Sequence, residues 1–163
     1  MSKSKVYLIG FITLLGFPAV GMAAWYFVEQ KNPFLLLEWK AVFDLSSVYG
    51  LLFGATYALF ALWLFKSALF KREFLSVCAG FGEEILFRAC IQYWIGPWVT
   101  AVLFVAIHGY LNPKNRSLFV YGLALVPFVL VLSFGYIEFG LWFSITAHFS
   151  YDLVLLFYYK KMK

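Results

Sequence analysis

Long apolar stretches separated by short polar breaks dominate the pattern of this chain. Six stretches can be drawn, at about residues 6–28, 48–70, 74–95, 97–112, 117–135 and 137–159. Most of them approach the roughly 20 residues that an α-helix needs to cross the hydrocarbon core of a bilayer. The third and fourth are separated only by Gly96-Pro97, which indicates a tight helical hairpin. The pattern predicts an all-α, polytopic membrane bundle of about six transmembrane helices.

Two N-terminal regions need separate interpretations. Residues 32–47 mix apolar and polar positions, Asn32 can cap a helix, and Pro33 suits its first position. We expect a short helix there, lying in the outer membrane interface. The first apolar stretch has a second interpretation, because its basic start, apolar run and small residues at 21–24 resemble a cleavable signal peptide.

Composition supports a membrane protein. The chain of 163 residues is 64% hydrophobic and only 13% charged, whereas soluble domains are about half apolar and about a quarter charged. We expect a single membrane domain over residues 1–163. Residues 1–70 would supply N-terminal spans and the interfacial helix, and residues 71–160 would form a core that carries the chemistry.

The net charge of +5 indicates orientation in the membrane and not nucleic-acid binding. With the N-terminus inside, Lys31 and Lys40 fall outside and Arg88 lies within a span. An excess of basic residues marks the cytoplasmic side, so we expect both termini in the cytoplasm and a multi-pass protein of the cell membrane. The ten basic residues on that side would be Lys3, Lys5, Lys66, Lys71, Arg72, Lys114, Arg116, Lys160, Lys161 and Lys163.

A few ionisable side chains lie within the apolar stretches. A charged residue at the bilayer centre costs about 2.5 to 3.5 kcal/mol on insertion scales, so such residues usually pair, face a wet cavity or do chemistry. Glu84 and Arg88 are four residues apart and can pair on one helix face. Glu83 points about 100° away from Glu84, which leaves it as the spare carboxylate and the candidate general base. The alternative is that the glutamates and Arg88 only hold the helix bundle together and take no part in chemistry.

Two histidines lie on other spans. His148 and Asp152 are again four residues apart, so the carboxylate can accept from the imidazole and fix its tautomer. His108 precedes Gly109 near the end of the fourth stretch. Counting 1.5 Å per residue from the cytoplasmic ends places these groups and Glu83 about 9 to 18 Å deep. Three spans of alternating direction thus bring their polar groups to one layer.

Three motifs in this order resemble a known family. EEILFR at 83–88, FVAIH at 104–108 and HFSYD at 148–152 are similar to the motifs of the CPBP family, which comprises CAAX-processing proteases and bacteriocin-processing or immunity (Abi) proteins. The resemblance covers about residues 71–160. It implies an intramembrane glutamic protease in which Glu83 activates water with the help of His108. Glu84 and Arg88 would be structural or would tune Glu83, and His148 and Asp152 would stabilise the oxyanion, directly or through orientation.

Asp152 departs from the form of the motif that has Asn. An asparagine can donate a hydrogen bond to an oxyanion, but an ionised aspartate only accepts and would repel it. Asp152 would therefore be protonated or would act on His148, and we favour the second role.

The resemblance implies hydrolysis of a membrane-tethered protein or peptide near a lipidated or hydrophobic end. Prenylated ends, peptide precursors and C-terminal sorting tails are compatible, and we favour the last two. The alternative is a non-proteolytic membrane scaffold or immunity-type protein of the same fold. Two histidines and a carboxylate are also a plausible metal set, but no HExxH motif occurs, so no metal or other cofactor is expected. A proton-coupled carrier would fit intramembrane carboxylates, but we find no paired repeats.

Overall fold

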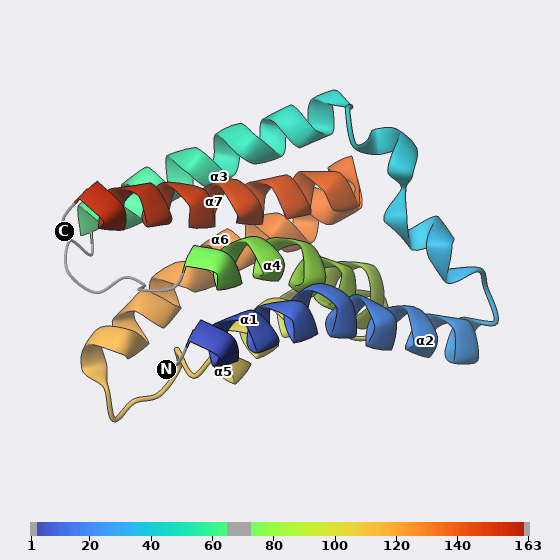
Figure 1. Ribbon diagram of the computed structural model, residues 1–163, viewed down its shortest axis with the longest axis horizontal. Coiled ribbons are helices and arrows are strands. Elements are labelled where there is room, and N and C mark those ends of the chain that lie inside the picture. Colours follow the sequence, from blue (N-terminus) through green and yellow to red (C-terminus); the bar gives the residue numbers. More distant parts are fainter. Residues whose placement is uncertain (1–2, 65–72, 162–163) are drawn as a thin grey trace.

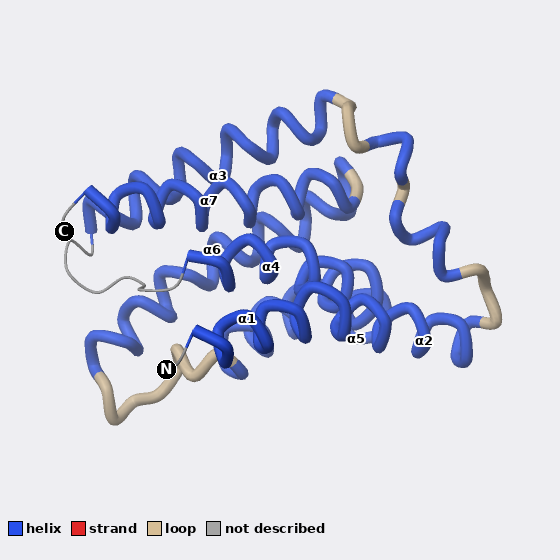
Figure 2. Tube along the Cα trace, viewed as in Figure 1, coloured by secondary structure: helices blue, strands red, loops and turns tan. Residues whose placement is uncertain are grey.

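The computed structural model describes residues 3–64 and 73–161, which form helices joined by turns and contain no strand (Figures 1 and 2). The predicted all-α fold is therefore confirmed. Lys66, Lys71, Arg72 and Lys163, on which part of the charge argument rests, lie outside the described residues. The elements are α1 (Lys3–Phe11), η1 (Ile12–Gly16), α2 (Phe17–Glu29), η2 (Pro33–Leu37), η3 (Trp39–Ala41), α3 (Leu45–Leu64), α4 (Glu73–Glu84), η4 (Ile85–Ile91), α5 (Gln92–Ile107), α6 (Arg116–Phe139) and α7 (Leu141–Lys161).

The predicted hairpin at Gly96-Pro97 is present. Gly96 has φ 77° and ψ 167°, a conformation that breaks the helix, and Figure 1 shows α5 running back beneath α4. The 25 residues from Glu83 to His108 would span roughly 37 Å in a straight helix, yet their side chains lie 3.5 Å apart. The glycine thus folds one long apolar stretch into two antiparallel arms.

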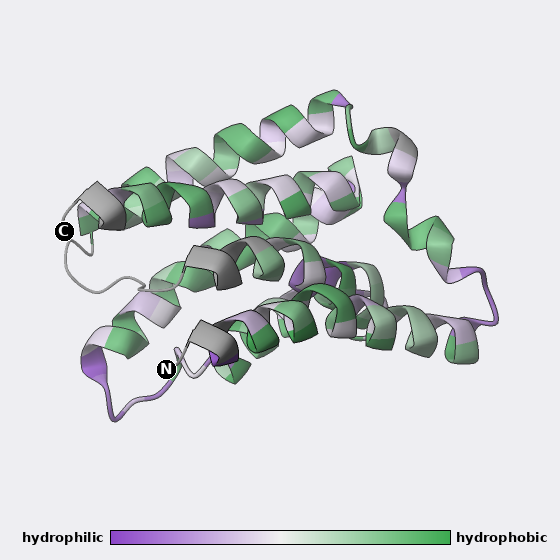
Figure 3. Ribbon diagram, viewed as in Figure 1, coloured by the Kyte–Doolittle hydropathy of each residue, from purple (hydrophilic) through white to green (hydrophobic). Residues whose placement is uncertain are grey.

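Five stretches of the described residues are helical, long enough and apolar enough to cross a membrane. Hydrophobic residues, green in Figure 3, make up much of these helices. Many of the large apolar side chains are exposed; Phe27, for example, is 72% exposed and Trp63 is 69% exposed. Such surface is stable against lipid and costly in water. The chain is an integral membrane protein, while the count of six spans and the cytoplasmic position of both ends stay predictions. The five stretches are Tyr7–Glu29, Leu45–Leu64, Cys78–Ile107, Arg116–Phe139 and Leu141–Tyr158, and Gly96 folds the third of them into the two arms described above.

The segment between α2 and α3 differs from the single short helix that we expected. Asn32 caps as predicted, because its Oδ1 accepts from the amide two residues further on at 3.0 Å. The segment then forms two 3₁₀ turns, η2 and η3, separated by Glu38 in the left-handed region with φ 42°. A left-handed residue cannot continue a helix, so Glu38 divides the segment in two. Its place in the membrane interface stays a prediction.

Glu38 also fixes the start of α7. Its Oε2 accepts from the backbone amide of Leu141 at 3.3 Å, which satisfies one of the free amides at the N-terminus of that helix. The indole Nε1 of Trp142 donates to the carbonyl of Leu37 at 2.8 Å. Through these two hydrogen bonds, the short segment holds the N-terminus of α7, the helix that carries His148 and Asp152.

Helices α3 and α7 lie side by side, as Figure 1 shows. The contact face of α3 repeats small buried residues at every third or fourth position, which lets two helix backbones approach closely. A Cβ added to Gly54 would meet the carbonyl oxygen of Ala147 and the hydroxyl of Ser150. The small face thus sets the distance between α3 and α7. The residues at these positions are Gly50, Gly54, Ala58 and Ala61.

Gly54→Ala is therefore expected to destabilise the protein by about 1 to 3 kcal/mol, the usual cost of overpacking. Gly16→Ala is the matched control, because its Cβ would meet only Ile12 Cγ2 at 3.6 Å, an ordinary contact, and alanine favours a helical backbone by up to about 1 kcal/mol. Thermal unfolding in detergent measures both variants. An equal melting temperature for the two would contradict the close packing of α3 on α7.

Candidate active site

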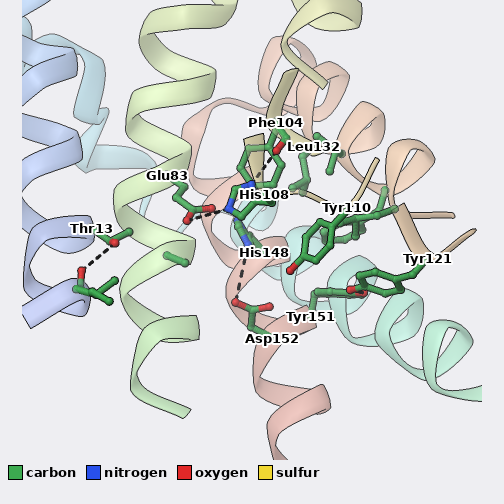
Figure 4. A pocket seen from close by; sticks show the side chains of 15 residues that line it. Thr13, Glu83, Phe104, His108, Tyr110, Tyr121, Leu132, His148, Tyr151 and Asp152 are labelled. Carbon is green, nitrogen blue, oxygen red and sulfur yellow. Dashed lines mark hydrogen bonds and ion pairs between the residues drawn. The ribbon is translucent and has the colours of Figure 1, made fainter. Parts of the chain in front are cut away.

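A cavity of about 330 Å³ opens within the bundle and is walled by α1, η1, α4, α5, α6 and α7, together with the turn that follows α5 (Figure 4). Four of the six predicted site residues line it, namely Glu83, His108, His148 and Asp152. Glu84 and Arg88 are fully buried behind them. The structure thus brings all three motifs to one place, with four side chains on the cavity and two supporting them.

Glu83 and His108 contact each other on the wall of the cavity. Glu83 lies at the end of α4 and His108 caps the end of α5, with 3.5 Å between Oε1 and Nε2 (Figure 4). The other imidazole nitrogen, Nδ1, lies 2.7 Å from the carbonyl oxygen of Phe104. A carbonyl only accepts, so Nδ1 carries a proton and donates. Nε2 therefore faces Glu83 as the position where a proton can be exchanged.

Glu84 uses both carboxylate oxygens. Arg88 Nε donates to Oε2 at 2.9 Å, so the predicted ion pair is confirmed, and both side chains are completely buried. Oε1 lies 2.8 Å from Nδ1 of His148 on α7. Because a carboxylate held by an arginine accepts, Nδ1 of His148 donates to it. Nε2 of His148 is then directed to the cavity.

The partner of His148 was only partly foreseen. The predicted approach of Asp152 is present, with 3.8 Å between His148 Nε2 and Asp152 Oδ2, but this is longer than a hydrogen bond. The shorter contact comes from Glu84, 64 residues earlier in the chain. Glu84 therefore orients this imidazole, and Asp152 lies on the cavity wall beside its Nε2. The helical period could not indicate this contact, because it joins two different helices.

Arg88 is held in an unusual setting. It lies in η4, a π-helical segment that follows directly after Glu84; such segments are frequent at functional sites. Its Cζ lies 5.2 Å from the ring centroid of Phe104, a cation–π contact. Among the described residues, its Nη1 and Nη2 have no hydrogen-bond partner. The guanidinium thus has Glu84 and the ring of Phe104 as its direct partners.

The N-terminal helix also contributes to the site. Ile9 and Thr13 line the cavity, and a Cβ added to Gly82 would meet the carbonyl of Thr13. The first helix therefore touches α4 at the residue before Glu83. Nothing in the sequence of residues 1–70 indicated this, since no motif lies there.

Three tyrosines form another wall that the sequence analysis missed. Tyr110 follows α5, Tyr121 lies on α6 and Tyr151 on α7, and all three line the cavity (Figure 4). The hydroxyls of Tyr121 and Tyr151 are 3.0 Å apart. The sequence did hold a signal for two of them, because they lie next to predicted site residues. Tyr110 is two residues after His108, and Tyr151 directly precedes Asp152.

The carboxylates and imidazoles around the cavity are arranged in pairs. Within the described residues, no three or more His, Cys, Asp or Glu side chains converge in a way that would hold a metal ion. What the arrangement offers chemically is a carboxylate beside an imidazole for proton transfer, with a second imidazole fixed by Glu84.

Comparison with known proteins places part of this chain beside known sequences. An uncharacterized protein of Bacillus subtilis strain 168, YpbD, is 34% identical over 81 residues, which are 50% of this chain and 41% of YpbD. The chain thus spans less than half the length of this relative. No solved structure matches. Residues 65–154, which include all three motifs, match the family described as type II CAAX prenyl endopeptidase Rce1-like. The resemblance drawn from the motifs is confirmed, and the chain belongs to the Rce1-like family of type II CAAX prenyl endopeptidases.

Proposed function

We propose that this protein is an intramembrane endopeptidase in which Glu83, assisted by His108, activates water for attack on a peptide bond. One observation carries the proposal: Glu83 Oε1 lies 3.5 Å from His108 Nε2 on the wall of a cavity within an apolar helix bundle. Membership of an endopeptidase family supports the same reaction class. A buried carboxylate beside an imidazole is the arrangement that general-base catalysis requires.

The proposed reaction uses two pairs of side chains, Glu83 with His108 and Glu84 with His148. Glu83 takes a proton from a water molecule in the cavity, and the water oxygen forms a bond to the carbonyl carbon of the peptide. The pair of Glu83 and His108 then passes that proton to the leaving nitrogen as the carbon–nitrogen bond breaks. His148, fixed by Glu84 through Nδ1, presents Nε2 toward the substrate. When protonated, Nε2 donates to the oxyanion, the type of stabilisation that usually contributes most to such reactions.

The substrate that suits this site is a membrane-tethered protein or peptide cleaved near a lipidated or hydrophobic end. The cavity volume of about 330 Å³ is at the lower end of ligand pockets. Apolar side chains of α6 form one wall, where an apolar segment would be held against the polar groups. The residues of that wall include Leu125, Phe128, Val129 and Leu132. Precursor peptides and C-terminal sorting tails remain our preferred substrates, with prenylated ends as the third class.

Reconstitution in liposomes tests the proposed reaction. The purified protein, mixed with candidate membrane-tethered peptides of the three classes, is expected to give two fragments by mass spectrometry. In isotopically labelled water, one label should enter the new carboxyl group. Cleavage should persist in EDTA and phenanthroline, because the proposed base is a carboxylate. Sensitivity to chelators would favour a metal-dependent reaction, and binding without cleavage would favour the scaffold or immunity-type function.

A further inference from the structure

In the proposed reaction, His148 is so far the one assigned hydrogen-bond donor to the substrate oxygen. Attack of water places a negative charge on the substrate oxygen, which needs hydrogen-bond donors. Glu83 and Asp152 line the cavity as carboxylates, which when ionised only accept and repel an oxyanion. Arg88 is buried behind Glu84 and does not line the cavity. Apart from His148, a donor must come from another wall.

Tyr110 lies on the turn after α5, in a fixed position. Gly109 has φ 76°, which favours glycine and turns the chain, and the amide of Tyr110 donates to the carbonyl of Val105 at 3.3 Å. Its ring stacks on His108, with centroids 5.8 Å apart and an angle of 9°. Its ring also meets Tyr121 edge to face, at 5.3 Å and 86°. Two aromatic contacts and the turn thus fix the ring next to the Glu83–His108 pair.

The hydroxyl of Tyr110 points toward the reacting groups. Figure 4 shows it directed into the space beside His148 and Asp152. Burial raises the pKa of the Tyr110 hydroxyl above its ordinary value near 10, so it keeps its proton at neutral pH and can donate. We propose that Tyr110 is a further catalytic residue, whose hydroxyl donates a hydrogen bond to the carbonyl oxygen of the scissile peptide and to the oxyanion formed from it. This role rests on the proposed peptidase function.

The other tyrosines of the bundle are placed differently from Tyr110. The hydroxyls of Tyr121 and Tyr151 contact each other at 3.0 Å, and both residues are buried. The hydroxyl of Tyr57 donates to the carbonyl of Ala124 at 2.6 Å, and Tyr57 does not line the cavity. Tyr110 is assigned the role by its position, because its ring stacks on His108 and its hydroxyl is directed into the space beside His148 and Asp152.

Tyr110→Phe tests the proposal because it keeps the ring and removes only the hydroxyl. We expect kcat to fall by about 10²-fold, the effect of losing one oxyanion donor, with KM nearly unchanged. Tyr57→Phe is the matched control and should leave kcat unchanged.

A peptide phosphinate that mimics the tetrahedral intermediate should bind Tyr110→Phe more weakly by the same factor, while the product peptide should bind both forms equally. The ratio of these two dissociation constants does not depend on the folded fraction of a preparation.

The outcomes separate the two proposals. If the unmodified protein cleaves none of the peptides, the proposed function fails, independently of Tyr110. If the unmodified protein cleaves and Tyr110→Phe has the same kcat and the same ratio of dissociation constants, the role of Tyr110 is overturned. A rise in KM alone also overturns it, because packing on His108 without donation would give that result.

Discussion

Glu83→Gln is expected to lower kcat by about 10² to 10⁴-fold, the usual contribution of a positioned general base, while the protein accumulates and folds normally. Glutamine has nearly the shape of glutamate but cannot take a proton from water. The carboxylate contacts His108 at 3.5 Å and is not part of the Glu84–Arg88 ion pair, so its replacement should not disturb the packing of α4. Cleavage of a membrane-tethered peptide in liposomes and thermal unfolding in detergent measure the two effects.

Glu138→Gln is the control for this variant, because Glu138 is exposed at the end of α6 and does not line the cavity. It loses the same charge and should keep full activity. Retained cleavage in Glu83→Gln would refute the assignment of the base. A cellular phenotype that survives Glu83→Gln, in the absence of any cleavage by the unmodified protein, would instead identify a scaffold or immunity-type role.

Arg88→Met is expected to have the largest effect on stability, about 3 to 5 kcal/mol, which is typical of removing one partner of a buried ion pair. Arg88 and Glu84 are both completely buried. Without the arginine, the Glu84 carboxylate would keep only His148 as its partner. We also expect cleavage to be lost, because Glu84 would no longer be held in the position that orients His148.

Two further variants separate charge from packing. Arg88→Lys keeps the charge and should recover part of the stability, although it lacks the planar fork of donors. The double variant Glu84→Gln, Arg88→Gln removes both charges and should be more stable than Arg88→Met, because no buried charge remains unpaired. Melting temperatures in one detergent compare all three forms. A double variant less stable than Arg88→Met would contradict the interpretation that an unpaired carboxylate is the source of the loss.

Much of the fold followed from local patterns. The lengths of the apolar stretches indicated membrane helices. Gly96-Pro97 indicated the hairpin, because the residues that form a turn are adjacent in the sequence. The pairing of Glu84 with Arg88 followed from the helical period alone, and the structure gives 2.9 Å for it. The three motifs indicated the family, whose match covers residues 65–154. The catalytic roles of these residues stay predictions that the proposed variants test.

The sequence by itself determined which side chains share a face of one helix, since that depends only on the 3.6-residue period. Which faces meet was decided by the tertiary structure. The contact of Glu84 with His148, the tyrosine wall and the approach of Thr13 to α4 all join separate helices. Their rotation and spacing are set by close contacts at Gly54 and Gly82, which act between backbones far apart in the chain. A period within a helix carries no information about these distances, so only the packed bundle could place the cavity and the groups around it.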